Sequence, residues 1–574
     1  MRSILCTIIL LLFSTPVRTV PAAELHPIAI LESKANFDAL KVAGVDHARG
    51  VAWWTALADD LGLPFRVMDD AALAEGVGDA SILIVIGAPS LTDAQVDAIQ
   101  VFNTAGGAVL LVGMPGQLHA DGTPRETPPA ISLAGITDPV SFEPEDEGAA
   151  NFTLRLSSPL GLVVEPALRL EVANAGLLWA ATLAEPAGYW VDWSMMPLLG
   201  DPPLLNASAA VALTEGTGGR VAWLGAPPEA ITEVNDQNVS ARRMSLQLLR
   251  WLLRKPWVHK GWWPLGLRAA TVLTADVETY FETGEAIALM LHREAVRGSF
   301  FLLGDLAKEY PYVVEALAEN GDVGSHSMHH KSFKGRTGDD QRAEIQEAIA
   351  DLHGLGIRHV EGFRPPKEEF DISTLQVVAE EGLGFIYGNL AYDRAWPIRR
   401  TVGELHLWQF ARIVPDDYNL AVHYGANTAA TYTADFMEWG QRIFDLGGLY
   451  PFSFHTNYLG LEKYVETIGR FIRWVKHQRI WIATFSDIVR WVEARELVDL
   501  TVREHPATME VTLTNRGTET VASFPLVYLG TTNGAPVILT ETDGIVLRAR
   551  EDFGHLILVD LAPGDSRTII IKDR

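Results

Sequence analysis

The stretch TVLTADVE at 271–278 begins a series of short β-rich runs, and this series decides the fold of the chain. Helical patterns lie between the runs, including QRAEIQEAIADLHGLG (341–356) and KYVETIGRFIRWVKHQ (463–478). Strands that alternate with helices form a parallel sheet, and about seven or eight such units favour a closed or nearly closed (β/α) barrel. We therefore predict a barrel domain over residues 265–497. The later runs are GSFFLLG (298–304), DVGSHS (322–327), HVEGFRPP (359–366), FIYGN (385–389), LAVHYG (420–425), YPFSFH (450–455) and IWIATFS (480–486).

An earlier series of runs and helices fills the first half of the chain. Helical patterns near 47–62 and 91–105 separate the runs, and Ser90 or Thr92 can cap the second helix. From about 140 to 225 the pattern becomes β-like, and the helical stretch SARRMSLQLLRWLLRK (240–255) ends the segment. We predict an α/β domain over 24–260 with a mainly parallel sheet covered on both faces. Its first runs are HPIAIL (26–31), PFRVMD (64–69), SILIVIG (81–87) and AVLLVG (108–113).

The end of the chain follows a different period. DLTVREHPATMEVTLTNRG (499–517) alternates apolar and polar residues, and ILVDL (557–561) and RTIIIKDR (567–574) continue this pattern. A period of two with Gly, Asn and Asp turns predicts a small all-β domain over 498–574, with the form of a sandwich. The aromatic stretch WVHKGWWP (257–264) lies between the first two domains, and interdomain packing explains its tryptophans better than sugar stacking does.

Composition and the N-terminus bound the class of protein. The chain has 574 residues and a net charge of −26, which argues against a nucleic-acid partner because phosphates attract a basic face. Arg2, an apolar run from Ile4 to Phe13 and small residues at Ala22 and Ala23 predict a signal peptide over 1–23. We therefore expect a periplasmic or secreted protein with no transmembrane span after cleavage. The only cysteine, Cys6, lies in the signal, so the mature chain has no thiol.

The stretch SHSMHHK (325–331) is a candidate metal site. His326 and His330 are four positions apart, so one helical turn would put both imidazoles on one side. Imidazole nitrogens suit zinc, cobalt or nickel. A polar turn in which histidines happen to lie is the alternative, and His329 is better explained as a surface residue.

Further polar residues follow other runs of the same series. Asp276 and Glu278 share one face of an extended segment, and two carboxylates at a strand end call for a cation or a proton between them. A solvated strand end is the alternative. The other candidates each have an ordinary structural explanation when taken alone, and are Arg364, Pro366, Asp393, Trp396 and His455.

Taken in order, TADVE, HSMHH, FRPP, YDRAW and SFH resemble the five motifs of the NodB-type polysaccharide deacetylases, the family 4 carbohydrate esterases. The resemblance covers roughly 268–495 and implies an irregular (β/α) barrel with one divalent metal ion, for which we expect zinc, with cobalt or nickel as alternatives. It implies that His326 and His330 bind the metal. The remaining roles implied are Asp276 as general base, Arg364 as the residue that orients it, His455 as general acid, Asp393 as the residue that tunes this acid, and Trp396 as a pocket wall.

The chain departs from the family pattern in two places. Val277 stands where the family has its metal-binding aspartate, and Glu278 has the face and the reach to replace it. If Glu278 does not bind, Asp276 would bind the metal and the base would be lost. The second departure is FRPPKEEF (363–370), which lacks the aromatic–glycine pair after its second proline, Pro366. A backbone N–H at Lys367 would then serve as the oxyanion donor of the family.

The first half resembles the class I glutamine amidotransferase-like domain, a flavodoxin-like fold, through its pattern and the phrase GGRVAWLGAPPEAI (218–231). The catalytic cysteine of that family cannot be present in the mature chain. The resemblance therefore implies a scaffold or a binding module.

These observations predict an exported, metal-dependent hydrolase that removes N-acetyl groups from an amino-sugar polysaccharide and yields acetate and a free amine. Asp276 would accept the proton of the attacking water, and His455 would protonate the leaving amine. Two alternatives stay open. One is a catalytically degenerate carbohydrate-binding or polysaccharide-assembly module, because a fold does not fix a function. The other is a metal-independent or differently specific amidohydrolase on the same fold, whose activity would survive chelation.

Overall fold

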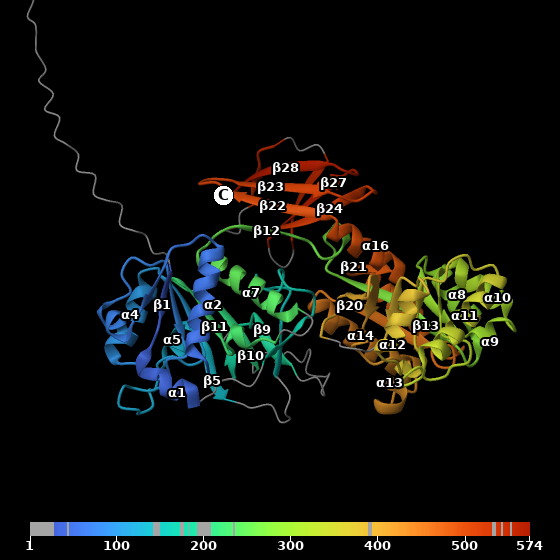
Figure 1. The fold of residues 1–574 in the computed structure, drawn as a ribbon, viewed down its shortest axis with the longest axis horizontal. Coiled ribbons are helices and arrows are strands. Elements are labelled where there is room, and N and C mark those ends of the chain that lie inside the picture. Colours follow the sequence, from blue (N-terminus) through green and yellow to red (C-terminus); the bar gives the residue numbers. More distant parts are fainter. Residues whose placement is uncertain are drawn as a thin grey trace, which may run out of the picture.

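The computed structural model describes residues 28–42, 45–141, 150–172, 177–182, 184–191, 208–232, 236–388, 393–530, 535–540, 544–550 and 554–573. The expected signal peptide, residues 1–23, lies outside the described residues. Figure 1 shows three bodies: an α/β body in blue and green, a second α/β body from lime to orange, and a red β body above them. We refer to them as the N-terminal, central and C-terminal domains.

The parallel part of the N-terminal sheet has the strand order β2-β1-β3-β4-β11. This order of parallel strands is the 2-1-3-4-5 order described for flavodoxin-like sheets. Antiparallel strands continue the same sheet as β10-β9-β6-β7, and β5 and β8 pair beside them. The bounds of the strands are β1 (Ile28–Leu31), β2 (Phe65–Met68), β3 (Ile82–Ile86), β4 (Ala108–Val112), β5 (Ile136–Ser141), β6 (Ala150–Leu154), β7 (Arg169–Val172), β8 (Leu178–Thr182), β9 (Gly188–Val191), β10 (Ala209–Glu215) and β11 (Arg220–Leu224).

Helices cover both faces of this sheet. Alternate side chains of β1 belong to two separate hydrophobic clusters, Ile28 and Ile30 to one and Ala29 and Leu31 to the other. A strand buried on both sides reads as a continuous apolar run, which is why these strands were predictable. Thr92 caps the predicted second helix, as expected. The main helices are α1 (Phe37–Val42), α2 (His47–Asp60), α3 (Asp70–Glu75), α4 (Asp93–Thr104), α5 (Pro129–Ala134) and α7 (Gln237–Leu252).

The central domain contains one mainly parallel sheet of nine strands in the order β18-β19-β17-β16-β15-β14-β13-β20, with β21 also paired to β13. The predicted β/α alternation is present. Among the described residues, however, no pairing joins β20 to β18 or β19, so the expected barrel closure is not found. The strands are β13 (Ala269–Val277), β14 (Gly298–Leu302), β15 (Gly321–Ser325), β16 (Gly362–Phe363), β17 (Phe385–Tyr387), β18 (Ile398–Val402), β19 (Leu405–Phe410), β20 (Leu449–His455) and β21 (Ile480–Ala483).

One predicted strand of this domain is a helix. The run LAVHYG lies in α13 (Asp417–His423) and the turn after it, and Asp416 caps this helix through its side chain. The prediction of a strand at 420–425 is therefore wrong. The other helices are α8 (Gly284–Arg293), α9 (Gly304–Ala307), α10 (Pro311–Glu319), α11 (Gly338–Gly354), α12 (Ile372–Glu380), α14 (Ala429–Asp445), α15 (Glu466–Lys476) and α16 (Phe485–Glu496).

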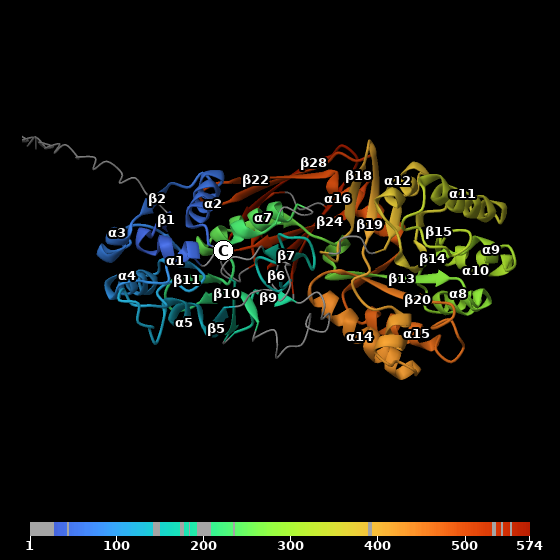
Figure 2. The ribbon, with the colours of Figure 1, turned by 60° about the horizontal axis from the view of Figure 1, so that its bottom comes forward.

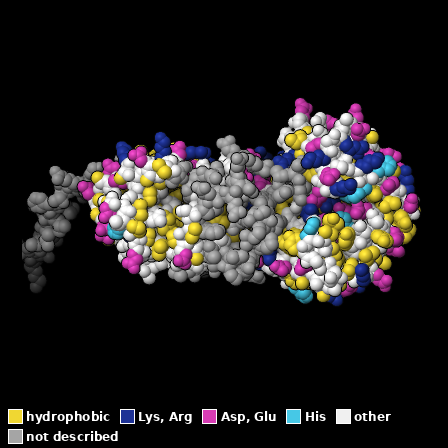
Figure 3. All heavy atoms as spheres, turned by 90° about the horizontal axis from the view of Figure 1, so that it is seen from below, with side chains coloured by type: hydrophobic (Ala, Val, Ile, Leu, Met, Phe, Trp, Pro, Cys, Tyr) yellow, Lys and Arg dark blue, Asp and Glu magenta, His cyan; other side chains and the backbone are white. Residues whose placement is uncertain are grey.

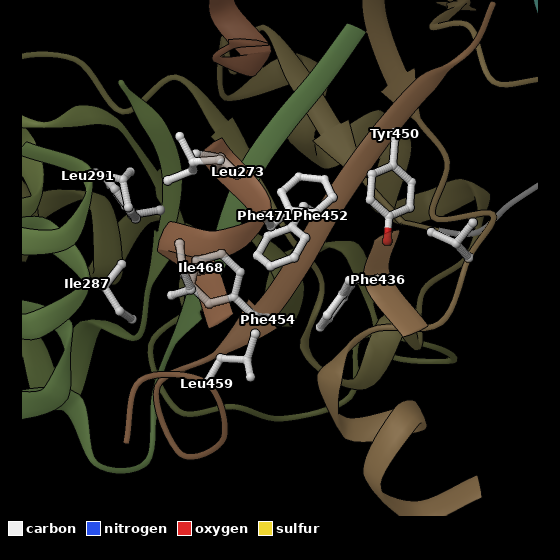
Figure 4. Close-up of a cluster of buried hydrophobic side chains, with 14 of the residues drawn as sticks. Leu273, Ile287, Leu291, Phe436, Tyr450, Phe452, Phe454, Leu459, Ile468 and Phe471 are labelled. Carbon is white, nitrogen blue, oxygen red and sulfur yellow. The ribbon is translucent and has the colours of Figure 1, made fainter. Parts of the chain in front are cut away.

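Aromatic packing fixes strand β20 against its helices. Phe452 stacks on Phe471 of α15, with ring centroids 4.2 Å apart, and lies 4.3 Å from Phe436 of α14. Figure 4 shows these rings with Tyr450 and Phe454 along the strand. All five side chains are buried. Because β20 ends in His455, this core also sets the position of that histidine.

The C-terminal domain is a sandwich of two antiparallel four-stranded sheets, β12-β24-β27-β26 and β22-β23-β28-β25. Strand β12 (Trp257–Lys260) lies before the central domain in the chain, yet it pairs with β24 (Val521–Leu529). The structure therefore assigns 257–260 to the C-terminal domain rather than to the end of the N-terminal one. The remaining strands are β22 (Val498–Glu504), β23 (Met509–Asn515), β25 (Val537–Ile538), β26 (Ile545–Ala549), β27 (His555–Leu561) and β28 (Ser566–Lys572).

Tryptophans join the three domains, as the sequence predicts for WVHKGWWP. Trp262 Nε1 donates to the carbonyl of Leu162 in the N-terminal domain at 3.1 Å, and Trp263 Nε1 donates to Gly447 of the central domain at 2.7 Å. Figure 2 shows the C-terminal strands against α16, which ends the central domain. Trp263 shares one hydrophobic cluster with residues of both the central and the C-terminal domains.

Charged side chains of both signs lie together on the face of the molecule seen from below. Figure 3 shows Lys, Arg, Asp and Glu side chains intermixed on the visible side of the right-hand lobe, with several histidines among them. The net charge of −26 therefore does not produce a single acidic surface in this view. No helix in the described part of the chain is long and apolar enough to cross a membrane.

Candidate active site

The candidate site lies at the carboxyl ends of three strands of the central sheet. Asp276 near the end of β13 is in register with His455 at the end of β20, and both strands run parallel. On the other side β14 separates β13 from β15, whose last residue, Ser325, precedes His326. Loops converge at the carboxyl ends of parallel strands, which is why polar side chains from distant segments meet here.

Three side chains of this site are placed to bind a metal ion. The Oε2 atom of Glu278 lies 2.7 Å from Nε2 of His330 and 3.7 Å from Nε2 of His326. One donor atom from each residue falls within 4.8 Å of the other two. Donors on a tetrahedral zinc ion, at bond lengths of about 2.1 Å, lie roughly 3.4 Å apart. The arrangement fits one small divalent ion, and it brings together the three residues that the sequence singled out as ligands.

Strand and turn geometry produce this cluster. Val277 is completely buried, so the two carboxylates on either side of it, Asp276 and Glu278, lie on the opposite face of the strand. His326 and His330 converge through a turn in which Ser327 and His330 adopt left-handed backbone angles, with φ of 70° and 52°. The expectation that one helical turn aligns the two histidines is wrong, because the turn is not helical. Left-handed non-glycine residues are costly and cluster at functional sites.

Neighbouring groups set the protonation states of the proposed metal ligands. Nδ1 of His326 lies 2.8 Å from the backbone oxygen of Arg364, so Nδ1 carries the proton and Nε2 is available for a metal. Burial alone would raise the pKa of Glu278, but its contacts with the imidazoles of His326 and His330 outweigh burial and hold the pKa well below its usual range. His329 is different: its side chain is exposed and contacts Glu344.

Asp276 has the surroundings of a general base. Arg364 donates from Nε to Oδ2 of Asp276 at 2.6 Å, and both side chains are buried. The other oxygen, Oδ1, is buried and has no hydrogen-bond partner within the described part of the chain. Burial raises the pKa of Asp276, but the positive charges of Arg364, His326 and His455 lower it by a larger amount. The pKa is therefore below its usual range, and the carboxylate is ionised.

His455 has the surroundings of a general acid. Its Nδ1 lies 2.6 Å from Oδ1 of Asp417, and its Nε2 lies 3.5 Å from Oδ2 of Asp276. Burial lowers the pKa of His455, but the charge and hydrogen bond of Asp417 raise it to about 10. The backbone N–H groups of His455 and Leu459 also donate to Asp417. The imidazole is therefore cationic at neutral pH, and its Nε2 faces the base.

The structure corrects the role expected for Asp393. This carboxylate is bound by Arg394 at 2.9 Å and by Gln237 Nε2 of the N-terminal domain at 3.0 Å. Its neighbour Ala395 accepts a hydrogen bond from Leu449, the first residue of β20, whereas His455 is the last. A strand rises about 3.3 Å per residue, so roughly 20 Å separates the two ends. Asp393 belongs to a domain interface, and Asp417 occupies the place beside His455.

The predicted role of Trp396 as a pocket wall is also wrong, because Trp396 lies at the opposite end of the strands from the candidate site. Its ring packs between Trp262 at 5.0 Å and Trp263 at 4.7 Å, at the amino-terminal end of the strands. It does not line the candidate site. Pro366 and Lys367 lie two and three residues after Arg364, and Lys367 has a left-handed φ of 59° in the short helix η7 (Pro366–Glu368). The use of its backbone N–H as an oxyanion donor remains a prediction.

Asp417 was missed because the helix that carries it was read as a strand. Its signal is the pair Asp416–Asp417 in IVPDDYNL (413–420), shortly after the strand that ends at Phe410. An acid at that place would qualify as a strand-end residue of the same series.

Comparisons with known proteins find similarity over part of the central domain. Residues 270–386 match the polysaccharide deacetylase family, so this segment is a deacetylase domain of the NodB type. The chain is 23% identical over 121 residues to a peptidoglycan-N-acetylmuramic acid deacetylase, PdaA, of Bacillus subtilis, covering 21% of this chain and 46% of that protein. It is 27% identical over 118 residues to a chitooligosaccharide deacetylase of Azorhizobium caulinodans, covering 20% and 56%. The chain thus spans about half the length of the curated relatives that it matches.

One solved structure aligns over almost the whole chain. Agd3, described as a novel carbohydrate deacetylase, covers 96% of this chain and 99% of its own, with 13% identity and a TM-score of 0.42. The resemblance of the N-terminal domain to the glutamine amidotransferase-like family stays a prediction.

Proposed function

We propose that the protein is an exported, metal-dependent deacetylase that removes N-acetyl groups from an amino-sugar polysaccharide. The observation that carries the proposal is the meeting of three groups at one sheet edge. These are the ligand set Glu278, His326 and His330, the ionised Asp276, and the cationic His455. A deacetylase needs a base for water and an acid for the leaving amine, and the two lie 3.5 Å apart here.

The chain's own residues divide the reaction between them. Water adds to the acetamide carbonyl while Asp276 accepts its proton, and Arg364 holds that carboxylate in place. The C–N bond then breaks, and His455 gives its Nε2 proton to the sugar nitrogen, which leaves as an amine. The products are acetate and the free amino sugar. A divalent ion bound by Glu278, His326 and His330 would supply Lewis acidity to the carbonyl and to the water, and zinc suits this set.

Export and the polymer substrate rest on separate support. The pattern of residues 1–23 supports cleavage and a periplasmic or secreted location. The two curated relatives are named for peptidoglycan and chitooligosaccharide substrates, and both substrates carry N-acetylated amino sugars. We propose that class of polymer for this chain.

Acetate release tests the proposal. The purified full chain would be incubated with N-acetylglucosamine oligomers and with peptidoglycan, as isolated, after chelation, and after zinc or cobalt is returned. We expect release that chelation abolishes and metal restores. Release that survives chelation would support a metal-independent amidohydrolase, and no release in any condition would support an inert binding or assembly module.

A pair of histidine variants localises the metal. His330→Ala removes a ligand, so we expect metal affinity to fall by about 10²-fold or more and acetate release to be lost. His329→Ala changes the adjacent residue, which contacts Glu344 instead. This control should keep both properties, and equal losses in the two variants would contradict the assigned ligand set.

A further inference from the structure

A chain of buried ion pairs continues behind the candidate site. Arg364, which holds Asp276, also lies with Nη1 3.1 Å from Oε1 of Glu368. Glu368 is in turn bound by Arg412 through two contacts of 2.7 Å, Nε to Oε1 and Nη2 to Oε2. A paired, two-point contact between a guanidinium and a carboxylate fixes orientation as well as distance. The side chains of Glu368 and Arg412 are only 14% and 15% exposed.

Arg412 also contacts the segment that positions the general acid, His455. Nη1 of Arg412 donates to Oδ1 of Asn419 at 2.6 Å and to the carbonyl of Val414 at 3.2 Å, and it lies 3.7 Å from Oδ2 of Asp416. Asp416 caps helix α13, whose first residue is Asp417. Arg412 therefore contacts the first turn of the helix that positions the partner of His455.

These contacts connect the base and the acid from behind. One arm runs from Asp276 through Arg364 to Glu368, and the other runs from His455 through Asp417 to the turn at Asp416. The Glu368–Arg412 pair is the link between the arms. Glu368 and Arg412 lie outside the set of site residues predicted from the sequence, and each pairs with the other.

We propose that Glu368 and Arg412 are positioning residues that hold the general base and the general acid at their working separation. This inference rests on the proposed function. An effective base–acid pair requires fixed geometry, and a displacement of about 1 Å far from the chemistry can cost on the order of 10²-fold in rate. Removing one partner also leaves a buried charge without compensation, so loss of fold must be measured separately from loss of rate.

The test compares Arg412→Gln, Arg412→Lys and Glu368→Gln with a control in the same domain. Arg342→Gln breaks another two-point guanidinium contact, here to two carboxylates, Glu380 and Glu381 at 2.6 Å each, between α11 and the end of α12. We expect Arg412→Gln and Glu368→Gln to lower kcat by about 10- to 100-fold with KM changed less than about 3-fold. Arg412→Lys keeps the charge but not the fork, so its kcat should be intermediate. Arg342→Gln should keep kcat.

A second readout follows the acid directly. The imidazole of His455 faces Asp417 and Asp416 from α13, Asp276 from β13, and the ring of Tyr458 at 6.2 Å. If Arg412 holds α13 in place, Arg412→Gln loosens the Asp417 contact, and the titration midpoint of His455 moves to lower pH. NMR of the histidine-labelled full chain, assigned with His455→Gln, measures this midpoint whether or not substrate turns over.

The outcomes separate the inference from the function on which it rests. Unchanged kcat per folded molecule and an unchanged His455 midpoint, with only a lower unfolding temperature, would overturn the positioning role. If the unaltered chain releases no acetate in any condition, the proposed function fails. The His455 midpoint alone then decides whether Arg412 positions the acid arm.

Discussion

At the scale of single residues, the carboxylate of Asp417 decides whether His455 carries a proton. The pKa of His455 is raised to about 10, and Asp417 is its largest source of stabilisation. We expect Asp417→Asn to lower this pKa towards the ordinary value near 6.5. Because a general acid must be protonated, the alkaline limb of the kcat–pH profile then moves to lower pH. At pH 8 only about 3% of an imidazole with a pKa near 6.5 is protonated, so the loss in kcat should be roughly 30-fold, and larger than at pH 6.

Asp393→Asn is the matched control for that variant. It makes the same chemical change at another buried acid, one that pairs with Arg394 and Gln237 at a domain interface. We expect its alkaline limb to coincide with that of the unaltered chain, and its unfolding temperature to fall. If the alkaline limb of the kcat–pH profile moved with Asp393→Asn but not with Asp417→Asn, Asp393 would be the residue that tunes His455, as the order of motifs implied. The pH dependence of acetate release at saturating substrate is the measurement.

Residue spacing could predict the metal cluster but not the acid's partner. The period of two in TADVE puts Asp276 and Glu278 on one face, and the buried Val277 between them agrees with this. Asp417 could not be placed in this way, because its contact with His455 joins segments 38 residues apart through a helix. The order of motifs pointed instead to Asp393, which lies at the opposite end of β20.

At the scale of elements, the packing of α15 on β20 supports the position of His455. Phe471 is fully buried and stacks on Phe452 at 4.2 Å, in the cluster that Figure 4 shows. Phe471→Ala should destabilise the central domain by about 3–5 kcal/mol, because it removes a large ring and leaves a cavity. Leu289→Ala is the control, since Leu289 is 63% exposed on α8. Its effect should stay within about 0.5 kcal/mol.

Chemical denaturation of the full chain, followed with a probe in the central domain, measures both variants. Equal midpoints for Phe471→Ala and the unaltered chain would show that the stack does not hold β20. The folded fraction of Phe471→Ala should still bind cobalt, because none of the three proposed ligands lies on α15 or β20.

Elements with a strong period were predictable, and short ambiguous runs were not. The helix expected near 47–62 is α2 (His47–Asp60), because its apolar positions follow the helical period over four turns. The prediction of a strand at LAVHYG (420–425) was wrong because a run of six residues with Leu, Ala and Val fits a strand as well as a helical turn. The capping carboxylate of Asp416, four residues before the run, was the evidence for the helix. Barrel closure depends on pairing between distant strands, which a count of runs does not determine.

At the scale of the whole molecule, the central domain is built into its neighbours rather than linked to them. Strand β12 pairs with β24 across nearly half of the chain, as with Trp257 opposite Leu529. No local sequence pattern predicts a pairing between strands so far apart in the chain. Lys260 at the end of β12 donates from Nζ to the carbonyls of Arg495 and Val498. The boundaries at 260 and 497 therefore cut through contacts.

A comparison of two truncated chains tests this integration. Fragment 265–497 retains every residue of the candidate site, but it loses β12 and the whole C-terminal domain. It would expose Phe485 and Trp491, which share a cluster with Phe524 and Ile557 of the removed domain. Each large apolar side chain returned to water costs about 1.5–3 kcal/mol, so we expect this fragment to be insoluble or unfolded.

Fragment 256–574 differs from it by keeping β12 and the C-terminal sandwich, and it should fold, bind cobalt and release acetate. It gives up the contacts with the N-terminal domain, among them the Trp262–Leu162 hydrogen bond and the Gln237–Asp393 pair. Soluble yield, thermal unfolding and cobalt titration of the two fragments make the comparison. If 265–497 matched the longer fragment in all three, the C-terminal domain would be a separable appendage, and substrate capture rather than stability would be the reason for its presence.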